Sequence, residues 1–200
     1  MMAADLEILE KQRILDSFLK VDRYRLRHSA FNGGWVGPMN REVVARPICV
    51  AVLPYDPVAD KILLIEQFRL QAHLAGLPAW QREVIAGIND KNEAIDEIAR
   101  REALEEAACA VTELWPVYRY LVSPGLTTET LCVFLGRFDS ESWKGGVHGL
   151  DYEHEDIRAS LHDAATVPEI LETGHTGNGP LILTLQWFLL NREKVRRKWR

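Results

Sequence analysis

The most informative stretch of the sequence is residues 87–109, which read GINDKNEAIDEIARREALEEAAC. Its later part, residues 92–107, contains no proline or glycine and is rich in Ala, Leu, Ile, Glu and Arg, so we expect a helix there. At about 100° per residue, Glu102, Glu105 and Glu106 share one face of this helix. Carboxylates crowded in this way repel one another unless a cation lies between them, and Mg²⁺ prefers oxygen ligands. The stretch therefore predicts a helix with a cation-binding face.

Six positions of this stretch also stand in a fixed order. The order is Gly-x5-Glu-x7-Arg-Glu-x-x-Glu-Glu, formed by Gly87, Glu93, Arg101, Glu102, Glu105 and Glu106. This pattern resembles the signature of the Nudix hydrolases. The alternative is an ordinary solvated acidic helix in which Arg101 pairs with Glu105 one turn later. Because six ordered positions agree, the signature is the favoured interpretation.

The resemblance extends from about residue 20 to the C-terminus. Four further segments look like the ADP-ribose pyrophosphatase branch of the family: residues 41–44, 65–69, 123–125 and 149–156. The resemblance implies an α/β class fold, a Nudix α/β/α sandwich preceded by a small antiparallel β domain. It also implies a homodimer in which the small domains are exchanged. We therefore expect an N-terminal β hairpin domain over residues 1–46 and a Nudix domain over residues 47–200.

The pattern along the chain agrees with this class. Residues 21–31 and 35–45 read as two strands around the turn Asn32–Gly34. A two-stranded hairpin is only marginally stable alone, so it must pack against the rest of the chain or against a second subunit. We expect strands at residues 48–53, 61–67, 82–86, 117–122, 131–138 and 157–161, and helices at 167–172 and 180–197. Residues 140–155 read as a long mobile loop. Strands interleaved with helices indicate an α/β sandwich.

The resemblance implies a role for each acid of the site. Glu102 and Glu106 would be the main Mg²⁺ ligands, with Mn²⁺ as an alternative metal, and Glu105 would support them. The backbone carbonyl of Ala86 would complete the set of ligands. Glu153 matches the catalytic base, and Glu155 matches a residue that holds metal or its water; the alternative is a solvated acidic loop. Arg101 would orient Glu105 without touching the substrate.

Residues for substrate binding are predicted outside the signature. Arg69 follows a strand and is suited to bidentate contact with a phosphate, although it also suits a surface position. Glu129 matches a family acid near the diphosphate, and Arg46 matches a family arginine beside the adenine-binding position. Trp35 and Phe31 flank the hairpin turn, where an aromatic ring is placed to stack on adenine across the dimer; the alternative is a core position.

The composition argues against nucleic-acid-binding, membrane and secreted proteins. The chain has 200 residues and a net charge of −5, which argues against nonspecific nucleic-acid binding. No signal peptide and no apolar run of membrane-spanning length is apparent, so we expect no membrane association. Three cysteines in apolar surroundings, Cys49, Cys109 and Cys132, suit a reducing compartment, and we expect a cytoplasmic protein.

Several positions depart from the family pattern. Ala108 replaces a glycine at the end of the signature helix, so the helix is expected to continue for a residue or two. Asn92 replaces a loop glycine, which we expect to be tolerated. Leu126 replaces a second glycine after Ser123–Gly125, and Ala45 replaces an acid that binds adenine.

Three functions remain open from the sequence. The first is Mg²⁺-dependent hydrolysis of ADP-ribose to AMP and ribose 5-phosphate. The second keeps the chemistry but changes the nucleoside diphosphate sugar, with GDP-mannose as the candidate, and Leu126 and Ala45 are its basis. The third is a sensor that binds a nucleotide sugar without cleaving it. The intact acids of the signature favour an enzyme over the sensor.

Overall fold

The computed structural model describes residues 5–91, 93–173 and 177–200, so Asn92 lies outside the described residues. The chain forms two compact units. The first contains the described residues up to Ile48 together with Tyr120–Thr130, and the second contains Cys49–Arg119 and Leu131–Arg200. The first unit thus takes in a segment that our boundary at residue 46 assigns to the second domain.

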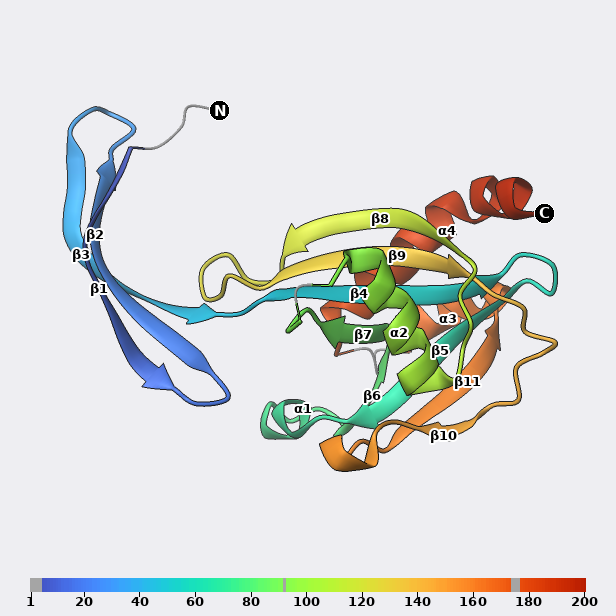
Figure 1. The fold of residues 1–200 in the computed structure, drawn as a ribbon. Helices are drawn as coiled ribbons and strands as arrows, with labels where there is room; N and C mark the ends of the chain where they lie inside the picture. The colour runs from blue at the N-terminus through green and yellow to red at the C-terminus, as the bar shows by residue number, and fades with distance from the viewer. Residues whose placement is uncertain (1–4, 92, 174–176) are drawn as a thin grey trace. The chain divides into compact units, whose positions relative to one another are not determined.

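The first unit is built on an antiparallel sheet in the order β1-β2-β3, formed by β1 (Leu6–Asp16), β2 (Lys20–Ser29) and β3 (Trp35–Ala45) (Figure 1). The predicted hairpin is β2 and β3, and its turn uses the positive φ angles of Gly33 and Gly34. Near the end of β3, the amide of Val44 donates to the carbonyl of Leu126 at 2.9 Å. That bond fastens the segment Tyr120–Thr130 to the sheet.

The main sheet has the strand order β10-β11-β5-β4-β9-β8, with β6 beside β5 and β7 beside β4. Its strands are β4 (Ile48–Asp56), β5 (Lys61–Phe68), β6 (Trp80–Glu83), β7 (Ile85–Ile88), β8 (Glu113–Leu121), β9 (Thr130–Arg137), β10 (Gly146–His148) and β11 (Ile157–Asp163). The central strands β4 and β5 are almost wholly buried. Such apolar runs are typical of strands covered on both faces.

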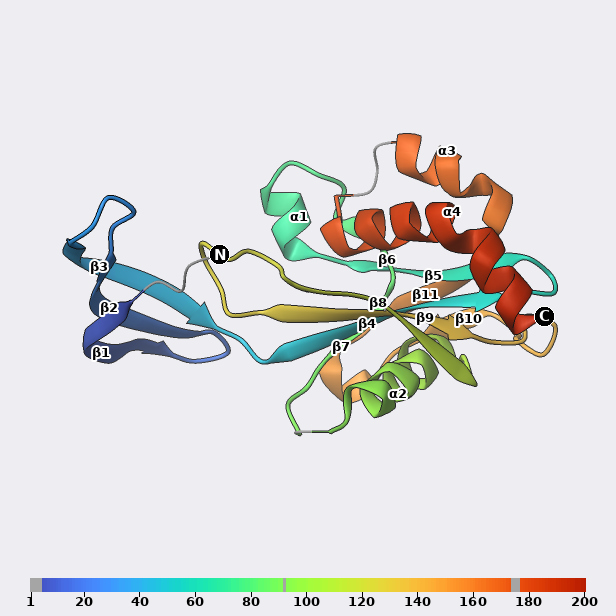
Figure 2. The same cartoon turned by 90° about the horizontal axis from the view of Figure 1, so that it is seen from above.

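Helices cover both faces of this sheet (Figure 2). Helix α2 (Ile95–Ala107) lies on one face, while α1 (Leu70–Leu74), α3 (Val167–Glu172) and α4 (Gly179–Trp199) lie on the other. Helix α2 buries Ile98, Ala99 and Ala103, whereas α4 buries Leu181 and Phe188. The predicted α/β/α sandwich with a small antiparallel β domain is confirmed. None of the helices in the described ranges combines the length and apolar character that a membrane span requires.

Some local predictions are wrong. Strand β1 was not predicted, because its apolar residues do not alternate regularly along LEILEKQRILD. The single strand expected at residues 82–86 is divided into β6 and β7, with a break at Val84. Helix α1 lies in a segment expected to be loop. The segment 140–155 contains β10 and the 3-10 helix η1 (Asp151–Glu153), so it is not an irregular loop throughout.

The end of α2 also differs from expectation. The helix does not continue past Ala107, because Ala108 adopts the left-handed conformation with φ 46° and ψ 35°. The amide of Cys109 reaches back to the carbonyl of Ala103 at 2.8 Å, and the amide of Ala108 reaches Leu104 at 3.0 Å. The bond from Ala108 to Leu104 is the one that closes a helix whose next residue is left-handed, a position usually occupied by glycine. The alanine therefore accepts the conformation that the family glycine would adopt.

Candidate active site

The signature glycine makes room for an acid of α2. Gly87 lies on β7, and a Cβ atom built on it would lie 1.8 Å from Oε1 and 1.9 Å from Cδ of Glu102. No side chain fits at residue 87 while Glu102 keeps this position. The Glu102 carboxylate therefore lies directly against the backbone of β7, and only 13% of its side chain is exposed.

Glu106 is more deeply buried, with 4% of the residue exposed. Its Oε2 accepts a hydrogen bond from the amide of Ala86 at 3.1 Å. Burial raises the pKa of Glu106 well above its ordinary value, and the charges of Glu102 and Glu155 raise it further, while the Ala86 amide and Arg69 oppose the rise. A cation placed at these carboxylates would remove that penalty.

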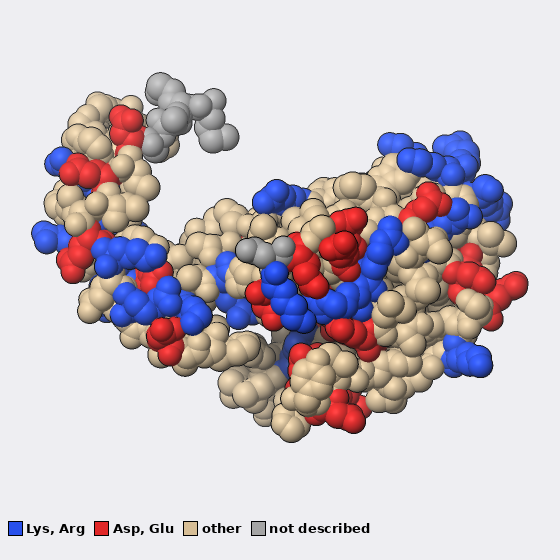
Figure 3. Space-filling model, viewed as in Figure 1, with Lys and Arg blue, Asp and Glu red and all other residues tan. Residues whose placement is uncertain are grey.

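Arg101 binds three acids of the signature. Its Nη1 lies 2.9 Å from Oε1 of Glu102 and 2.8 Å from Oε2 of Glu105, and its Nη2 lies 3.2 Å from Oε2 of Glu93. The pairing of Arg101 with Glu105 one turn later is the one that we predicted. The guanidinium thus fixes the direction of carboxylates that would otherwise repel one another (Figure 3 shows the basic side chains among the acidic ones over α2).

Of the two acids predicted in the segment 140–155, the structure brings one to α2. Glu155 is half-buried, and its Oε2 accepts a hydrogen bond from the amide of Leu150 at 3.1 Å. Gly149, against which Glu155 packs, donates its amide to the carbonyl of Glu105 on α2 at 3.3 Å. Burial raises the pKa of Glu102, Arg101 opposes the rise, and the charges of Glu105 and Glu155 add to it. Glu153 is exposed on η1 and finds no ion pair among the described residues. The predicted base is therefore at the surface in this conformation.

Arg69 is held by an acid that the sequence analysis missed. Its Nε lies 2.9 Å from Oε1 and its Nη2 2.7 Å from Oε2 of Glu83, which is 5% exposed. Gln67 donates to the same carboxylate at 3.2 Å. The available signal was an acid directly before the apolar residues Val84 and Ile85, because a buried acid has to be paired. Arg69 keeps 43% of its side chain exposed.

The donor set suits a hard divalent cation. Glu102, Glu106 and Glu155 offer carboxylate oxygens, and Ala86 offers a backbone carbonyl beside Glu106. Oxygen donors with concentrated negative charge are what Mg²⁺ prefers. Within the described residues, no three acidic, histidine or cysteine side chains already converge closely enough to form a preassembled metal centre. These residues therefore suit Mg²⁺ by the chemistry and the charge of their oxygen donors.

The remaining predicted residues lie in the first unit. Arg46 and Glu129 come together, with Nε of Arg46 3.4 Å from Oε2 of Glu129, and the Arg46 amide donates to Oγ1 of Thr128 at 2.9 Å. Trp35 is half-exposed beneath Arg27, whose Cζ lies 4.7 Å from the ring centroid. Phe31 is fully exposed. Neither aromatic has the core position that was the alternative to ligand stacking.

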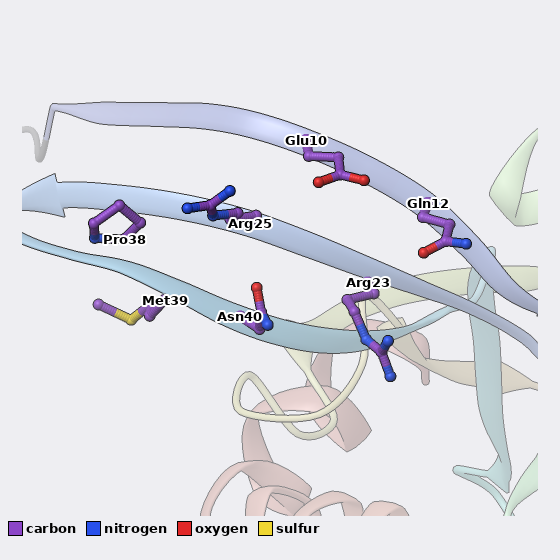
Figure 4. A pocket seen from close by; sticks show the side chains of 7 residues that line it. All are labelled: Glu10, Gln12, Arg23, Arg25, Pro38, Met39 and Asn40. Carbon is purple, nitrogen blue, oxygen red and sulfur yellow. The ribbon is translucent and has the colours of Figure 1, made fainter.

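A separate hollow of about 490 Å³ lies on the sheet of the first unit (Figure 4). It is lined by Glu10, Gln12, Arg23, Arg25, Pro38, Met39 and Asn40. Glu10 and Asn40 are the strand neighbours of Arg25 on either side. None of the predicted site residues lines this hollow.

Known proteins resemble the chain over nearly all of its length. A model of the NUDIX domain family matches residues 45–184. The ADP-ribose pyrophosphatase of Escherichia coli (strain K12) is 35% identical over 195 residues, covering 98% of this chain and 93% of that protein. The ADP-ribose pyrophosphatase of Haemophilus influenzae is 33% identical, with 98% and 91% covered. A GDP-mannose pyrophosphatase of Enterobacter sp. (strain 638) is 27% identical, with 92% and 97% covered.

The fold has a counterpart among solved structures. The crystal structure of an ADP compounds hydrolase superposes with a TM-score of 0.70 at 18% identity and covers 96% of both chains. At that identity the likeness concerns the fold alone. The family match and the two relatives above 30% identity bear out the resemblance read from the signature and its neighbouring segments. The chain therefore belongs to the Nudix hydrolase family.

Proposed function

We propose that the protein hydrolyses the pyrophosphate bond of ADP-ribose, giving AMP and ribose 5-phosphate, with Mg²⁺ as its metal. The observation that carries this proposal is the burial of two signature acids, Glu102 against the backbone of Gly87 and Glu106 against the amide of Ala86, because buried carboxylates need a cation to stay ionised. The two relatives above 30% identity are named for this activity.

Each residue would have a distinct task. Glu102 and Glu106 would hold the metal, assisted by Glu105, Glu155 and the Ala86 carbonyl. The bound cation supplies charge that neutralises the diphosphate and stabilises the negative charge developing at phosphorus. Arg101 keeps the carboxylates oriented. Glu153 would accept the proton of the attacking water, and its exposed place on η1 leaves it free to approach when substrate is bound.

Further residues are proposed to contact the substrate. Arg69 would bind a phosphate with the part of its guanidinium that Glu83 leaves exposed. In the first unit, Arg46 and Glu129 would contact the nucleotide, and Trp35 or Phe31 would stack on adenine. We further propose a homodimer with exchanged first units, because the strands and turns of this unit expose several large apolar residues, among them Leu6, Ile8, Phe18 and Phe31.

The cellular setting is proposed from composition and the cysteines. Cys49, Cys109 and Cys132 are all buried, which suits a reducing compartment such as the cytoplasm. The net charge of −5 gives no support to nucleic-acid binding. The expected partner is a nucleoside diphosphate sugar.

A second substrate has specific support. The GDP-mannose pyrophosphatase relative covers 92% of the chain, and Leu126 is 58% exposed in the turn where the family often has glycine. Ala45, at the end of β3, has no carboxylate that could bind adenine. These features favour GDP-mannose as the alternative substrate within the same chemistry.

A substrate panel tests the proposal. Both products are phosphomonoesters, so a phosphatase added to the assay releases phosphate from them but not from the intact diphosphate. The panel contains ADP-ribose, GDP-mannose, ADP-glucose, NADH and a dinucleoside polyphosphate, each with Mg²⁺. The highest kcat/KM for ADP-ribose is the expected result, and a preference for GDP-mannose would move the specificity while keeping the chemistry. Binding of nucleotide sugars without any turnover would overturn the enzyme in favour of a sensor.

A further inference from the structure

The last turn of α2 ends with backbone carbonyls that the helix itself leaves unbonded. The amides of Ala108 and Cys109 turn back to the carbonyls of Leu104 and Ala103. The amide of Cys109 is therefore not available to the carbonyl of Glu105, and the helix ends before it can provide a donor for the carbonyl of Ala107, so both carbonyls need donors from elsewhere. This turn directly follows the metal-binding face proposed above, so whatever supplies those donors is attached to the site.

Two groups of the segment 140–155 supply them. The indole Nε1 of Trp143 donates to the carbonyl of Ala107 at 2.7 Å. The amide of Gly149 donates to the carbonyl of Glu105 at 3.3 Å. One donor precedes β10 and the other follows it, so the segment is fastened to the end of α2 at two points.

The second fastening continues to Glu155. Gly149 has a φ of +111°, and a Cβ atom on it would lie 2.6 Å from Cβ and 3.1 Å from the carbonyl oxygen of Glu155. The backbone of Glu155 therefore packs directly on Gly149. The next amide, that of Leu150, holds the Glu155 carboxylate at 3.1 Å. A continuous chain of contacts thus runs from the carbonyl of Glu105 at the end of α2 through Gly149 to Glu155.

We propose that Trp143 and Gly149 are positioning residues, which fix the place of Glu155 relative to α2 and its acids by capping the last carbonyls of α2. The inference rests on the proposed function of these acids. Neither residue belongs to the set that would touch the metal or the substrate. Glu155 lies fifty residues away from the signature in sequence, and its place would depend on this docking.

The test uses Trp143→Phe, which keeps an aromatic ring but removes the N–H donor. Small displacements of a catalytic group are costly, so we expect kcat for the best substrate to fall about tenfold with KM changed less than about twofold. Glu155→Gln is then combined with it in a double-mutant cycle. Because Trp143 acts through Glu155, Trp143→Phe is expected to cause no further loss in the Glu155→Gln background.

The Mg²⁺ affinity of the same four proteins is measured by isothermal titration calorimetry, which needs no catalytic turnover. Trp143→Phe is expected to weaken Mg²⁺ binding in the wild-type background and to leave it unchanged in Glu155→Gln. Losses that multiply in either cycle would overturn the inference, because Trp143 would then act independently of Glu155. An unchanged Trp143→Phe variant would overturn it as well. Failure of the wild-type protein to hydrolyse any substrate would overturn only the proposed function, since the Mg²⁺ cycle still decides the positioning role.

Two further variants sharpen the result. Gly149→Ala places a methyl group against Glu155 and is expected to reduce kcat more than Trp143→Phe, again without added loss in the Glu155→Gln background. Trp187→Phe is the matched control, because this tryptophan lies on α4, on the opposite face of the sheet, and pairs with Trp115 at 6.5 Å. A fall in kcat for Trp187→Phe equal to that for Trp143→Phe would contradict a specific role for the indole bond.

Discussion

Glu102 rests against the bare backbone of Gly87, so closely that a methyl group at residue 87 would overlap its carboxylate, with 1.8 Å between Cβ and Oε1. The two residues are fifteen positions apart and lie on different elements, β7 and α2. The glycine of the signature is thus explained by the space that the acid requires.

Gly87→Ala is expected to reduce kcat at least a hundredfold, because the methyl group displaces Glu102 from the proposed metal site, and misplacing a catalytic group by about 1 Å costs about that much. Steady-state kinetics at saturating Mg²⁺ measures the loss. Gly179→Ala is the matched control, since a Cβ there meets no atom within 4 Å, and it should keep full activity. Equal activity of Gly87→Ala and wild type would refute the spatial argument.

The buried carboxyl group of Glu106 should make the stability of the protein depend on pH and on metal. Its pKa is raised by burial in the folded protein, so without metal the folded state gains stability at low pH and loses it as the pH rises through the folded pKa. A bound cation would favour the ionised form, and the rise in Tm caused by Mg²⁺ should therefore grow from pH 5 to pH 8.

Glu106→Gln keeps the acceptor for the Ala86 amide but has no charge. In EDTA at pH 8 its Tm is expected to exceed that of wild type, because the ionisation penalty is gone. With Mg²⁺ it should gain little stability and show at most about one hundredth of the wild-type kcat. Thermal melts across the pH range, with and without Mg²⁺, provide the measurement. A variant that Mg²⁺ stabilises as much as it does wild type would remove Glu106 from the ligand set.

Glu153 and Glu155 are expected to fail in different ways. Glu153→Gln should lower kcat about a hundredfold or more while Mg²⁺ binding is unchanged, because a general base acts on water and not on the metal. Glu155→Gln should weaken Mg²⁺ binding, since the proposed ligand set includes this carboxylate, which is docked on the end of α2 through Gly149. Glu141→Gln, exposed on the same segment, serves as the control for loss of charge. If Glu153→Gln alone weakens Mg²⁺ binding, Glu153 is the metal ligand and Glu155 the candidate base.

Ala108→Gly should stabilise the protein by about 0.5–1 kcal/mol, because Ala108 occupies the left-handed region that glycine enters without strain. Urea unfolding at neutral pH gives the free energy of unfolding. Ala110→Gly, two residues further along and without a positive φ, should lower stability or leave it unchanged. If both glycine variants lose stability, Ala108 is not strained.

The strong periodic patterns of the sequence predicted several elements, among them the helix that carries the signature acids. Helix α2, strand β3 and helix α3 lie where their residues indicated, and the order of acids on α2 identified the family. These features depend on residues close together in sequence, where periodicity and helix propensity operate. The fold class followed from the same local patterns.

Three features that the sequence did not reveal depend on specific hydrogen bonds in the folded protein. Glu83 looks like an acid interrupting an apolar strand until Arg69, fourteen residues earlier, is seen beside it. Trp143 reads as an aromatic in a polar loop, since nothing near it reveals that its indole reaches Ala107, 36 residues away. Ala108 was expected to prolong the helix because propensity ignores the back-bond from Cys109 to Ala103. Tertiary hydrogen bonds decide the first two cases, and a local hydrogen bond at the helix end decides the third.

The buried cysteines have a practical consequence. Burial raises the pKa of the Cys109 thiol to about 12 and also raises that of Cys132, so neither forms the thiolate that alkylating reagents attack at neutral pH. Cys49 is 8% exposed. A cysteine introduced on the surface, for example Glu141→Cys beside Trp143, should then be labelled selectively in the otherwise native protein. A fluorophore attached there would follow the segment 140–155 in solution without removing any natural thiol.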